Sequence, residues 1–137
     1  MKTREIHLDA LDSAERSLPP NQPVYMLNLL RYRDEALYDD RPGEPPCTGR
    51  EAFHRRYVPA FRRLAGGLPV QRVFFGSLLA KIVGPEGAQW HDAALNEYAD
   101  FATFRSVVDS DAYRREVAPH RHAALDDFRL FALVKAM

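Results

Sequence analysis

The chain has 137 residues, the length of one domain, which should bury about two thirds of the surface that its unfolded form exposes. Its 19 Lys and Arg residues balance 19 Asp and Glu residues, so no overall charge attracts nucleic acid or an anionic membrane. The one cysteine, Cys47, can form no disulfide within the chain and belongs to no zinc-binding cluster. No stretch approaches the roughly 18 apolar residues of a membrane span, and the N-terminus is charged where a signal peptide needs an apolar run. We therefore expect a soluble, unprocessed cytoplasmic protein with no nucleic-acid or membrane partner.

Apolar residues at helical spacing predict a short amphipathic helix over residues 9–17, ended by Pro19. With the proline-rich connector that follows, this helix forms an N-terminal appendage, residues 1–22, ahead of a single domain, residues 23–137. The domain begins with a strand over 23–33 that is apolar on both alternating faces, as expected for a strand covered on both sides. Its one polar residue in the middle is Asn28, whose amide is costly to bury without hydrogen-bond partners.

A loop over residues 34–47 is rich in Pro, Gly and Asp and is long for a compact domain, so we expect it to cover a cavity or a partner. Thr48 and Glu51 then have the spacing of a capping box, which predicts the start of a helix. Pro59 removes one hydrogen bond of this helix and predicts a kink near residues 55–58. The helix should end at Gly66 and Gly67.

Alternating apolar residues predict one long strand over residues 68–83, with a bulge at Gly76. After a turn at residues 84–87, a second alternating stretch over 88–98 completes a hairpin. Asp100 is placed to cap a second helix, which is interrupted at residues 109–111 and divided by Pro119 from a further turn over 120–125. A last strand over 128–134 is again apolar on both faces.

The element order behind the short N-terminal helix is β-α-β-β-α-β. This order predicts an α+β, ferredoxin-like fold with a four-stranded antiparallel sheet. The helices of such a fold cover only one face of the sheet, yet three of the predicted strands are apolar on both faces. An exposed apolar face of this size is rare in monomers, so we expect a homodimer formed by sheet-to-sheet packing.

Several sequence features carry a family resemblance: the segment 23–33, the segment 47–53 with Tyr57, the pairs Gly66–Gly67 and Gly84–Pro85, Trp90, and the segments 111–113 and 121–125. In these features the chain resembles, over residues 20–136, a bacterial family of uncharacterised dimeric α/β-barrel proteins. The resemblance implies a ferredoxin-like protomer whose sheet joins a partner's in a barrel. Relatives in the same superfamily include antibiotic-biosynthesis monooxygenases, small-molecule isomerases and heme-degrading monooxygenases, so the resemblance implies no single reaction.

The ferredoxin-like strand order places the first strand beside the third, which predicts a polar cluster in an otherwise apolar pocket. Asn28 would lie near Trp90 or Asp92, and Tyr57 and Arg121 would approach from the helices. If the pocket is catalytic, Asn28 and Arg121 would hold an oxyanion, and Asp92 or a histidine would move a proton. The residues expected to bind a substrate are Tyr57, Arg72, Trp90 and His120. The alternative is structural, with the same side chains filling the core and pairing with one another.

Nothing in the sequence predicts a metal or a cofactor. Gly66–Gly67 lacks the remaining residues of a phosphate-binding loop, and His120 and His122 do not have the helical spacing of zinc ligands. Asn28 and Trp90 match, in strand and type, two active-site residues of the heme-degrading relatives. Those relatives carry a histidine iron ligand on the second helix, which here begins with residues 100–104 and has none; His91, His120 or His122 would have to replace it.

The sequence thus favours a homodimer that binds an unknown small molecule, with a cofactor-independent monooxygenase-like or isomerase-like reaction as the enzymatic interpretation. Its alternative is a non-catalytic ligand-binding or interaction module. Heme binding is the weaker third alternative.

Overall fold

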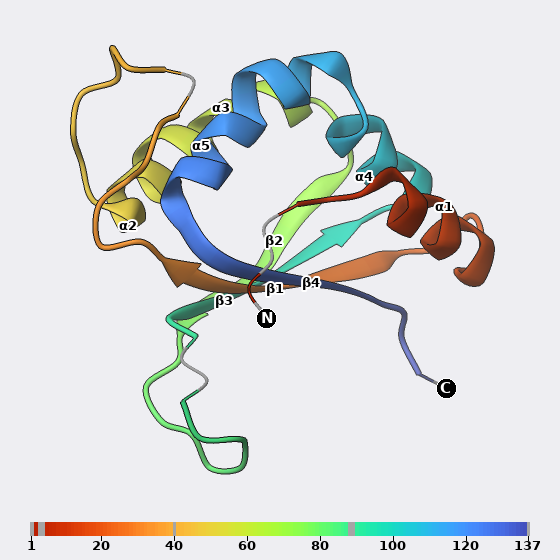
Figure 1. Cartoon of the computed structure of the whole chain (residues 1–137). Helices are drawn as coiled ribbons and strands as arrows, with labels where there is room; N and C mark the ends of the chain where they lie inside the picture. The colour runs from red at the N-terminus through yellow and green to blue at the C-terminus, as the bar shows by residue number, and fades with distance from the viewer. Residues whose placement is uncertain (1, 3–4, 40, 88–89, 137) are drawn as a thin grey trace.

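The helices lie on one face of a four-stranded antiparallel sheet in the computed structural model, which describes residues 2, 5–39, 41–87 and 90–136 (Figure 1). The strand order is β2-β3-β1-β4, with every neighbouring pair antiparallel. This order confirms the ferredoxin-like fold. The strands are β1 (Val24–Tyr32), β2 (Val70–Ser77), β3 (Asp92–Tyr98) and β4 (Leu125–Leu133).

The helical layer consists of an N-terminal helix and two longer segments, each built from several pieces. The first element is α1 (Leu8–Ser17), as the sequence predicted. One long segment comprises α2 (Gly49–Ala52), η1 (Phe53–Tyr57) and α3 (Val58–Ala65), and it begins with the predicted capping box. The other comprises α4 (Phe101–Val108), capped by Asp100, then η2 (Tyr113–Val117) and α5 (Ala118–Ala124).

The two elements η1 and η2 are π-helical turns, and each lies directly before a helix whose second residue is proline. A proline has no N–H to donate to the preceding turn, and its ring collides with the carbonyl four residues earlier. A π turn, which has one extra residue, relieves this conflict without ending the helix. The kink predicted from Pro59 is therefore a π turn at Phe53–Tyr57, and Pro119 lies inside the first turn of α5 instead of dividing it from the preceding helix.

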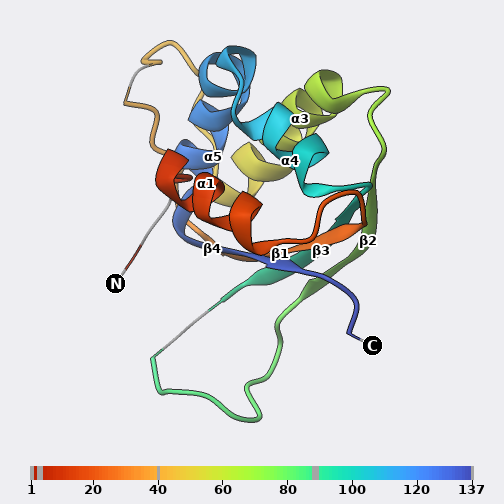
Figure 2. The ribbon, with the colours of Figure 1, turned by 90° about the vertical axis from the view of Figure 1, so that its right-hand side faces the viewer.

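The hairpin strands are shorter than the sequence predicted. Pairing ends at Ser77 and Asp92, and the described residues between them, 78–87 and 90–91, form an arm on the side of the sheet away from the helices (Figure 2). Gly84, Pro85 and the other turn residues lie in this arm. The predicted start of the second strand, at residues 88–89, falls outside the described residues.

The bulge of β2 lies between Arg72 and Phe74, not at Gly76 as the sequence suggested. The extra residue reverses the alternation of side chains, so Arg72 and Phe75 pair with Asn96 and Ala94 of β3. Gly76 is needed for a different reason, because a Cβ there would collide with the Phe74 ring. The bulge thus brings an arginine and a phenylalanine to the helix-covered face.

The two faces of β1 have different surroundings. Val24, Met26, Leu30 and Tyr32 are buried beneath the helices, and Asn28 shares their face. The opposite face carries Tyr25, Leu27 and Leu29, all partly exposed, and no helix covers it (Figure 2). Asn28 therefore points toward the helical layer.

The N-terminal helix packs on the domain through apolar and ionic contacts. Leu11 is buried in the main core. Arg105 of α4 donates to Asp12 at 2.6 Å and to Glu15 at 3.4 Å. These contacts hold α1 against α4.

Among the glycines, Gly49 lies closest to neighbouring backbone atoms. A Cβ at this position would overlap the carbonyl oxygens of Arg33 and Ala124. We predict that Gly49→Ala lowers the free energy of unfolding by about 3 kcal/mol, because backbone cannot move aside as a side chain can. Urea unfolding followed by circular dichroism measures this change. The control is Gly43→Ala, whose Cβ meets no atom within 4 Å and should leave stability nearly unchanged; equal effects of the two substitutions would contradict the prediction.

Candidate functional site

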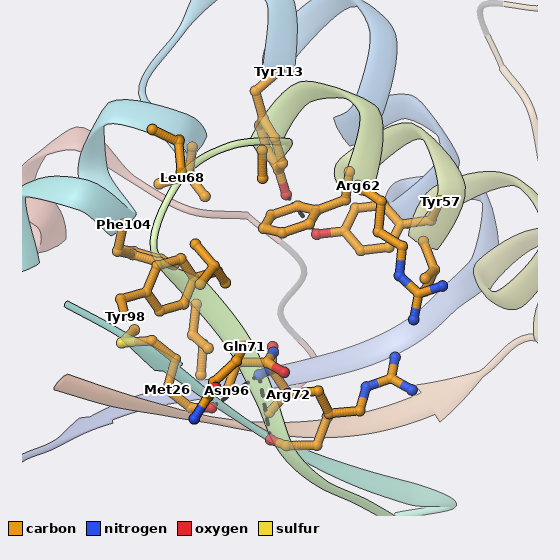
Figure 3. Close-up of a pocket in the computed structure, with 18 of the residues that line it drawn as sticks. Met26, Tyr57, Arg62, Leu68, Gln71, Arg72, Asn96, Tyr98, Phe104 and Tyr113 are labelled. Carbon is orange, nitrogen blue, oxygen red and sulfur yellow. Dashed lines mark hydrogen bonds between the residues drawn. The ribbon is translucent and has the colours of Figure 1, made fainter. Parts of the chain in front are cut away.

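A cavity of about 340 Å³ lies between the sheet and the helical layer (Figure 3). Its walls are largely aromatic, and its polar side chains come from both the sheet and the helices. The aromatic lining residues are Phe53, Tyr57, Phe61, Phe75, Tyr98, Phe104, Tyr113 and Phe128, and the polar ones include Asn28, Arg62, Gln71, Arg72 and Asn96. An apolar cavity with a few convergent polar groups is the usual form of a small-molecule site.

Asn28 lies on the sheet side of the cavity, and its amide orientation is determined by its neighbours. Its Nδ2 donates to the backbone oxygens of Met26 at 3.2 Å and Ala94 at 3.4 Å. Both partners are acceptors, so the NH₂ group must face them. The Oδ1 atom remains to face the cavity, where Asn28 offers an acceptor. The oxyanion-holding role suggested by the sequence requires a donor, and both donors of this amide are already used.

A chain of polar groups runs from the helices into the cavity. The Arg121 guanidinium donates to the hydroxyl of Tyr113. The Tyr113 oxygen lies 3.0 Å from the Tyr57 oxygen, and Figure 3 shows these two hydroxyls directed toward each other. Arg121 is only 3% exposed, and its guanidinium lies 5.4 Å from the centre of the Phe128 ring. Tyr57 and Tyr113 line the cavity, whereas Arg121 lies behind Tyr113 and lines a second hollow next to α1. Arg121 is therefore linked to the cavity through the hydroxyls of the two tyrosines.

Two arginines face one another at one side of the cavity. Arg62 comes from α3 and Arg72 from β2, and their guanidinium groups extend toward each other (Figure 3). Neither forms an ion pair with a carboxylate among the described residues. Arg72 also lies over the Phe75 ring, 5.0 Å from its centre. This pair gives the cavity a cationic side.

Asp92 lies at the end of β3 beyond Phe75, outside the cavity lining. Its carboxylate is fully buried and accepts hydrogen bonds from the Tyr32 hydroxyl at 2.6 Å and from Arg50 at 2.7 Å. The Tyr32 hydroxyl also lies 3.1 Å from His54 Nε2, and the His54 ring packs edge-on against Phe75. Asp92 thus ties together β1, β3 and the helix that follows the loop.

The environment of this cluster determines which of its groups are charged. Burial opposes ionisation of Asp92, but hydrogen bonds from Tyr32 and Ser77 and the charge of Arg50 outweigh it and lower the pKa of the carboxyl. Burial and the adjacent carboxylate raise the pKa of Tyr32. Burial lowers the pKa of His54 despite the attraction of Asp92. At neutral pH the cluster therefore holds an ionised Asp92 beside neutral Tyr32 and His54.

Trp90 and His120 lie away from the cavity. Trp90 precedes β3, and the Arg129 guanidinium lies 5.2 Å from the centre of its ring. His120 Nδ1 lies 2.8 Å from the Tyr38 hydroxyl, beneath the loop that precedes α2. Of the residues predicted from sequence, the structure brings Asn28, Tyr57 and Arg72 together and leaves Asp92, Trp90, His120 and Arg121 outside the cavity lining.

Sequence reasoning missed Arg62, Gln71, Asn96, Tyr98 and Tyr113, all of which line the cavity. Tyr113 carried one usable signal, since it lies in the helical stretch before a proline, as Tyr57 does. No cluster of three or more His, Cys, Asp or Glu side chains suited to a metal ion occurs in the part of the chain that the structure describes. No helix within those residues is both long and apolar enough to cross a membrane.

No protein-family model matches the chain, and no curated protein matches it. Among solved structures, the RPA0582 protein of unknown function from Rhodopseudomonas palustris is 28% identical, with a TM-score of 0.79 over 100% of this chain and 99% of that chain. The structure of methylated RPA0582 protein is also 28% identical, with a TM-score of 0.78 over 99% of this chain and 96% of that one. A dimeric protein of unknown function and ferredoxin-like fold from Bacteroides fragilis is 13% identical, with a TM-score of 0.43 over 84% of this chain and 98% of its own. The chain is thus similar to proteins of unknown function.

The cluster around Asp92 should make stability depend on pH. Because folding lowers the Asp92 pKa below its ordinary 3.8, the ionised carboxylate stabilises the fold above that pH, and this contribution is lost as the pH falls through the lower value. We predict that Asp92→Asn lowers the free energy of unfolding by about 1–3 kcal/mol at neutral pH, because the charged hydrogen bond from Arg50 is lost. The difference between variant and parent should shrink in acid. Urea unfolding near pH 7 and near pH 3 measures it; a difference that grows in acid would contradict the assignment.

Proposed function

We propose that the protein is a homodimer that binds a small organic anion in the cavity of each protomer. The observation that carries this proposal is the pair of arginines, Arg62 and Arg72, facing each other beside an aromatic cavity without carboxylate partners among the described residues. Guanidinium groups bind carboxylates and phosphates through parallel N–H donors. A ligand with an anionic group beside the two arginines and an apolar body against the aromatic walls would match both the charged and the apolar parts of the lining.

The size of the cavity supports a ligand of about one or two rings. Cavities that hold small molecules begin at about 300 Å³, and this one has about 340 Å³. Its aromatic walls favour a flat, apolar body, since ring contacts add to the burial of apolar surface. Asn28 and Asn96 on the sheet side and Tyr57 on the helix side would orient such a ligand.

Binding is the function that this geometry supports best. Asp92, the carboxylate that the sequence suggested as a proton carrier, is fully buried among Tyr32, Arg50 and His54 and does not line the cavity. A monooxygenase-like or isomerase-like reaction therefore rests on the resemblance alone. The cavity lining also includes no histidine that could serve as a heme ligand.

The charge preference is testable with para-ethylbenzoate and its uncharged counterpart, para-ethylbenzyl alcohol. The parent protein should bind the carboxylate about tenfold more tightly, because charge-assisted hydrogen bonds exceed neutral ones. The double variant Arg62→Gln, Arg72→Gln should bind both compounds equally. Titrations followed by two-dimensional NMR measure the dissociation constants.

Two further variants serve as controls. Arg63→Gln removes a neighbouring exposed arginine of α3 that does not line the cavity, and it should keep the preference for the carboxylate. Ala94→Leu adds a side chain to the cavity wall and should weaken binding of both compounds. An Ala94→Leu variant that binds both as the parent does would place the ligand elsewhere and overturn the proposal.

The uncovered face of the sheet supports the dimer. Its apolar side chains come from all four strands: Tyr25, Leu27, Leu29, Phe74, Leu95, Phe131 and Leu133. Phe74 is 64% exposed and Phe131 51% exposed, which is costly for large apolar groups gathered on one surface. The arm extends on the same side of the sheet (Figure 2), and its residues Leu79, Ile82 and Val83 are more than 90% exposed. A second copy packed face to face would cover the sheet and lie between the two arms.

We predict that Phe131→Glu converts the dimer to monomer at micromolar concentration, because it places a charge within the apolar face. Sedimentation velocity over a dilution series measures the mass. Leu8→Glu, at an equally exposed leucine on α1, is the control and should remain dimeric. A parent protein that is monomeric throughout the series would contradict the dimer and leave the cavity proposal standing.

A further inference from the structure

Chemistry determines the direction of the hydrogen bond between Arg121 and Tyr113. A guanidinium has only donors, so Arg121 must donate and the Tyr113 oxygen must accept. The Tyr113 hydrogen then points elsewhere, and the Tyr57 oxygen at 3.0 Å is the acceptor that the structure offers it. Along this chain of hydrogen bonds, Tyr113 accepts from Arg121 and Tyr57 accepts from Tyr113.

The Tyr57 hydrogen is consequently left for the cavity. Tyr57 accepts from Tyr113 and makes no other hydrogen bond to the described residues. The reverse order, with Tyr57 donating to Tyr113, would leave the free hydrogen on Tyr113, which is only 2% exposed, whereas Tyr57 is partly exposed. The first order therefore leaves the free hydrogen on the more accessible hydroxyl, and an unsatisfied buried donor is costly. The order Arg121 to Tyr113 to Tyr57 gives each hydroxyl oxygen a donor and leaves the Tyr57 hydrogen for the cavity.

The surroundings strengthen this donor. Arg121 is 3% exposed, so its charge acts through a region of low dielectric and polarises both hydroxyls in the same direction. Burial raises the pKa of Tyr57, and the hydroxyl stays protonated at neutral pH. The cavity thus meets a fixed O–H donor and no phenolate.

We infer that Tyr57 donates a hydrogen bond to the ligand, that Arg121 aligns this donor through Tyr113, and that the ligand therefore carries a carbonyl or enolate oxygen in addition to its anionic group. This inference rests on the proposed function and names the class of ligand: a keto acid with an aromatic-sized body. Tyr57 binds the ligand, whereas Tyr113 and Arg121 are positioning residues. Asn28 Oδ1, on the opposite side of the cavity, offers an acceptor to an enol or hydroxyl of the same molecule.

The test compares para-acetylbenzoate with para-ethylbenzoate, which lacks only the ketone oxygen. The parent protein should bind the ketone about fivefold more tightly than Tyr57→Phe does, a factor typical of one hydrogen bond inside a protein. Both proteins should bind para-ethylbenzoate alike. The infrared carbonyl stretch of bound para-acetylbenzoate should lie lower in the parent than in Tyr57→Phe, a shift that a merely structural role of Tyr57 would not produce.

Tyr113→Phe tests the alignment. It keeps the Tyr57 hydroxyl but removes its link to Arg121, and it should move the bound carbonyl stretch part of the way toward the Tyr57→Phe value. Tyr38→Phe is the matched control, because it removes a hydroxyl bonded to His120 outside the cavity, and it should match the parent. Thermal unfolding of each variant confirms that it folds.

The outcomes separate this inference from the proposed function. If the parent binds both compounds and Tyr57→Phe changes neither the affinity for the ketone nor its carbonyl stretch, Tyr57 is not the donor, and the anion-binding cavity stands. If Tyr113→Phe matches the parent, the alignment through Tyr113 is wrong. If the parent binds neither compound, the inference falls together with the proposed function.

Discussion

The hydrogen bond between the Tyr57 and Tyr113 hydroxyls joins the two long helical segments over the cavity. Tyr57 is the last residue of one π turn and Tyr113 the first residue of the other. Each turn exists because a proline at the second position of the next helix cannot donate to the preceding turn. Two backbone irregularities with the same cause therefore bring two phenols to the same place. Because the two helical segments meet here through the hydroxyl ends of the tyrosine rings, the cavity remains open between those rings and the sheet.

The sheet forms the opposite wall of the cavity, and its buried polar side chains are hydrogen-bonded to neighbouring groups. Asn28 could not remain in a strand covered by helices unless its amide found acceptors, and it finds them on β1 itself and on β3. Asp92, the first residue of β3, is a buried carboxylate, which is costlier to bury than an amide. Hydrogen bonds from Tyr32 and Arg50 keep it in its charged form. The two polar residues differ in whether they offer a group to the cavity. Asn28 keeps one atom for the cavity, whereas Asp92 is enclosed by its partners.

Local sequence signals predicted the fold well, and the site only in part. The capping box at Thr48, the cap at Asp100 and the alternation in β1 depend on neighbouring residues, so they can be read from sequence. The bulge in β2 cannot be read from the sequence, because a bulge depends on the partner strand. The alternating pattern alone puts Arg72 and Phe74 on one face, whereas the structure places them on opposite faces. For the same reason, the residues that surround Asp92 and exclude it from the cavity come from distant segments and could not be foreseen. Nothing in the sequence distinguishes Arg62 from the other arginines of its helix, because Arg72, which faces it, comes from β2.

The bulge in β2 also allows one edge strand to serve two surfaces. After the extra residue, Phe74 points to the uncovered face and Phe75 to the cavity, so adjacent phenylalanines are divided between the proposed dimer seam and the proposed ligand site. The residues on the cationic side of the cavity, Arg62 and Arg72, lie on the helix side of the sheet, away from the apolar face. A second copy on the outer face would therefore leave the cavity open to solvent. Because β2 pairs only with β3, a shift of this edge strand in the dimer would move Arg72 and Phe75 as well. Packing at the proposed seam and the geometry of the cavity would thus be coupled through a single strand.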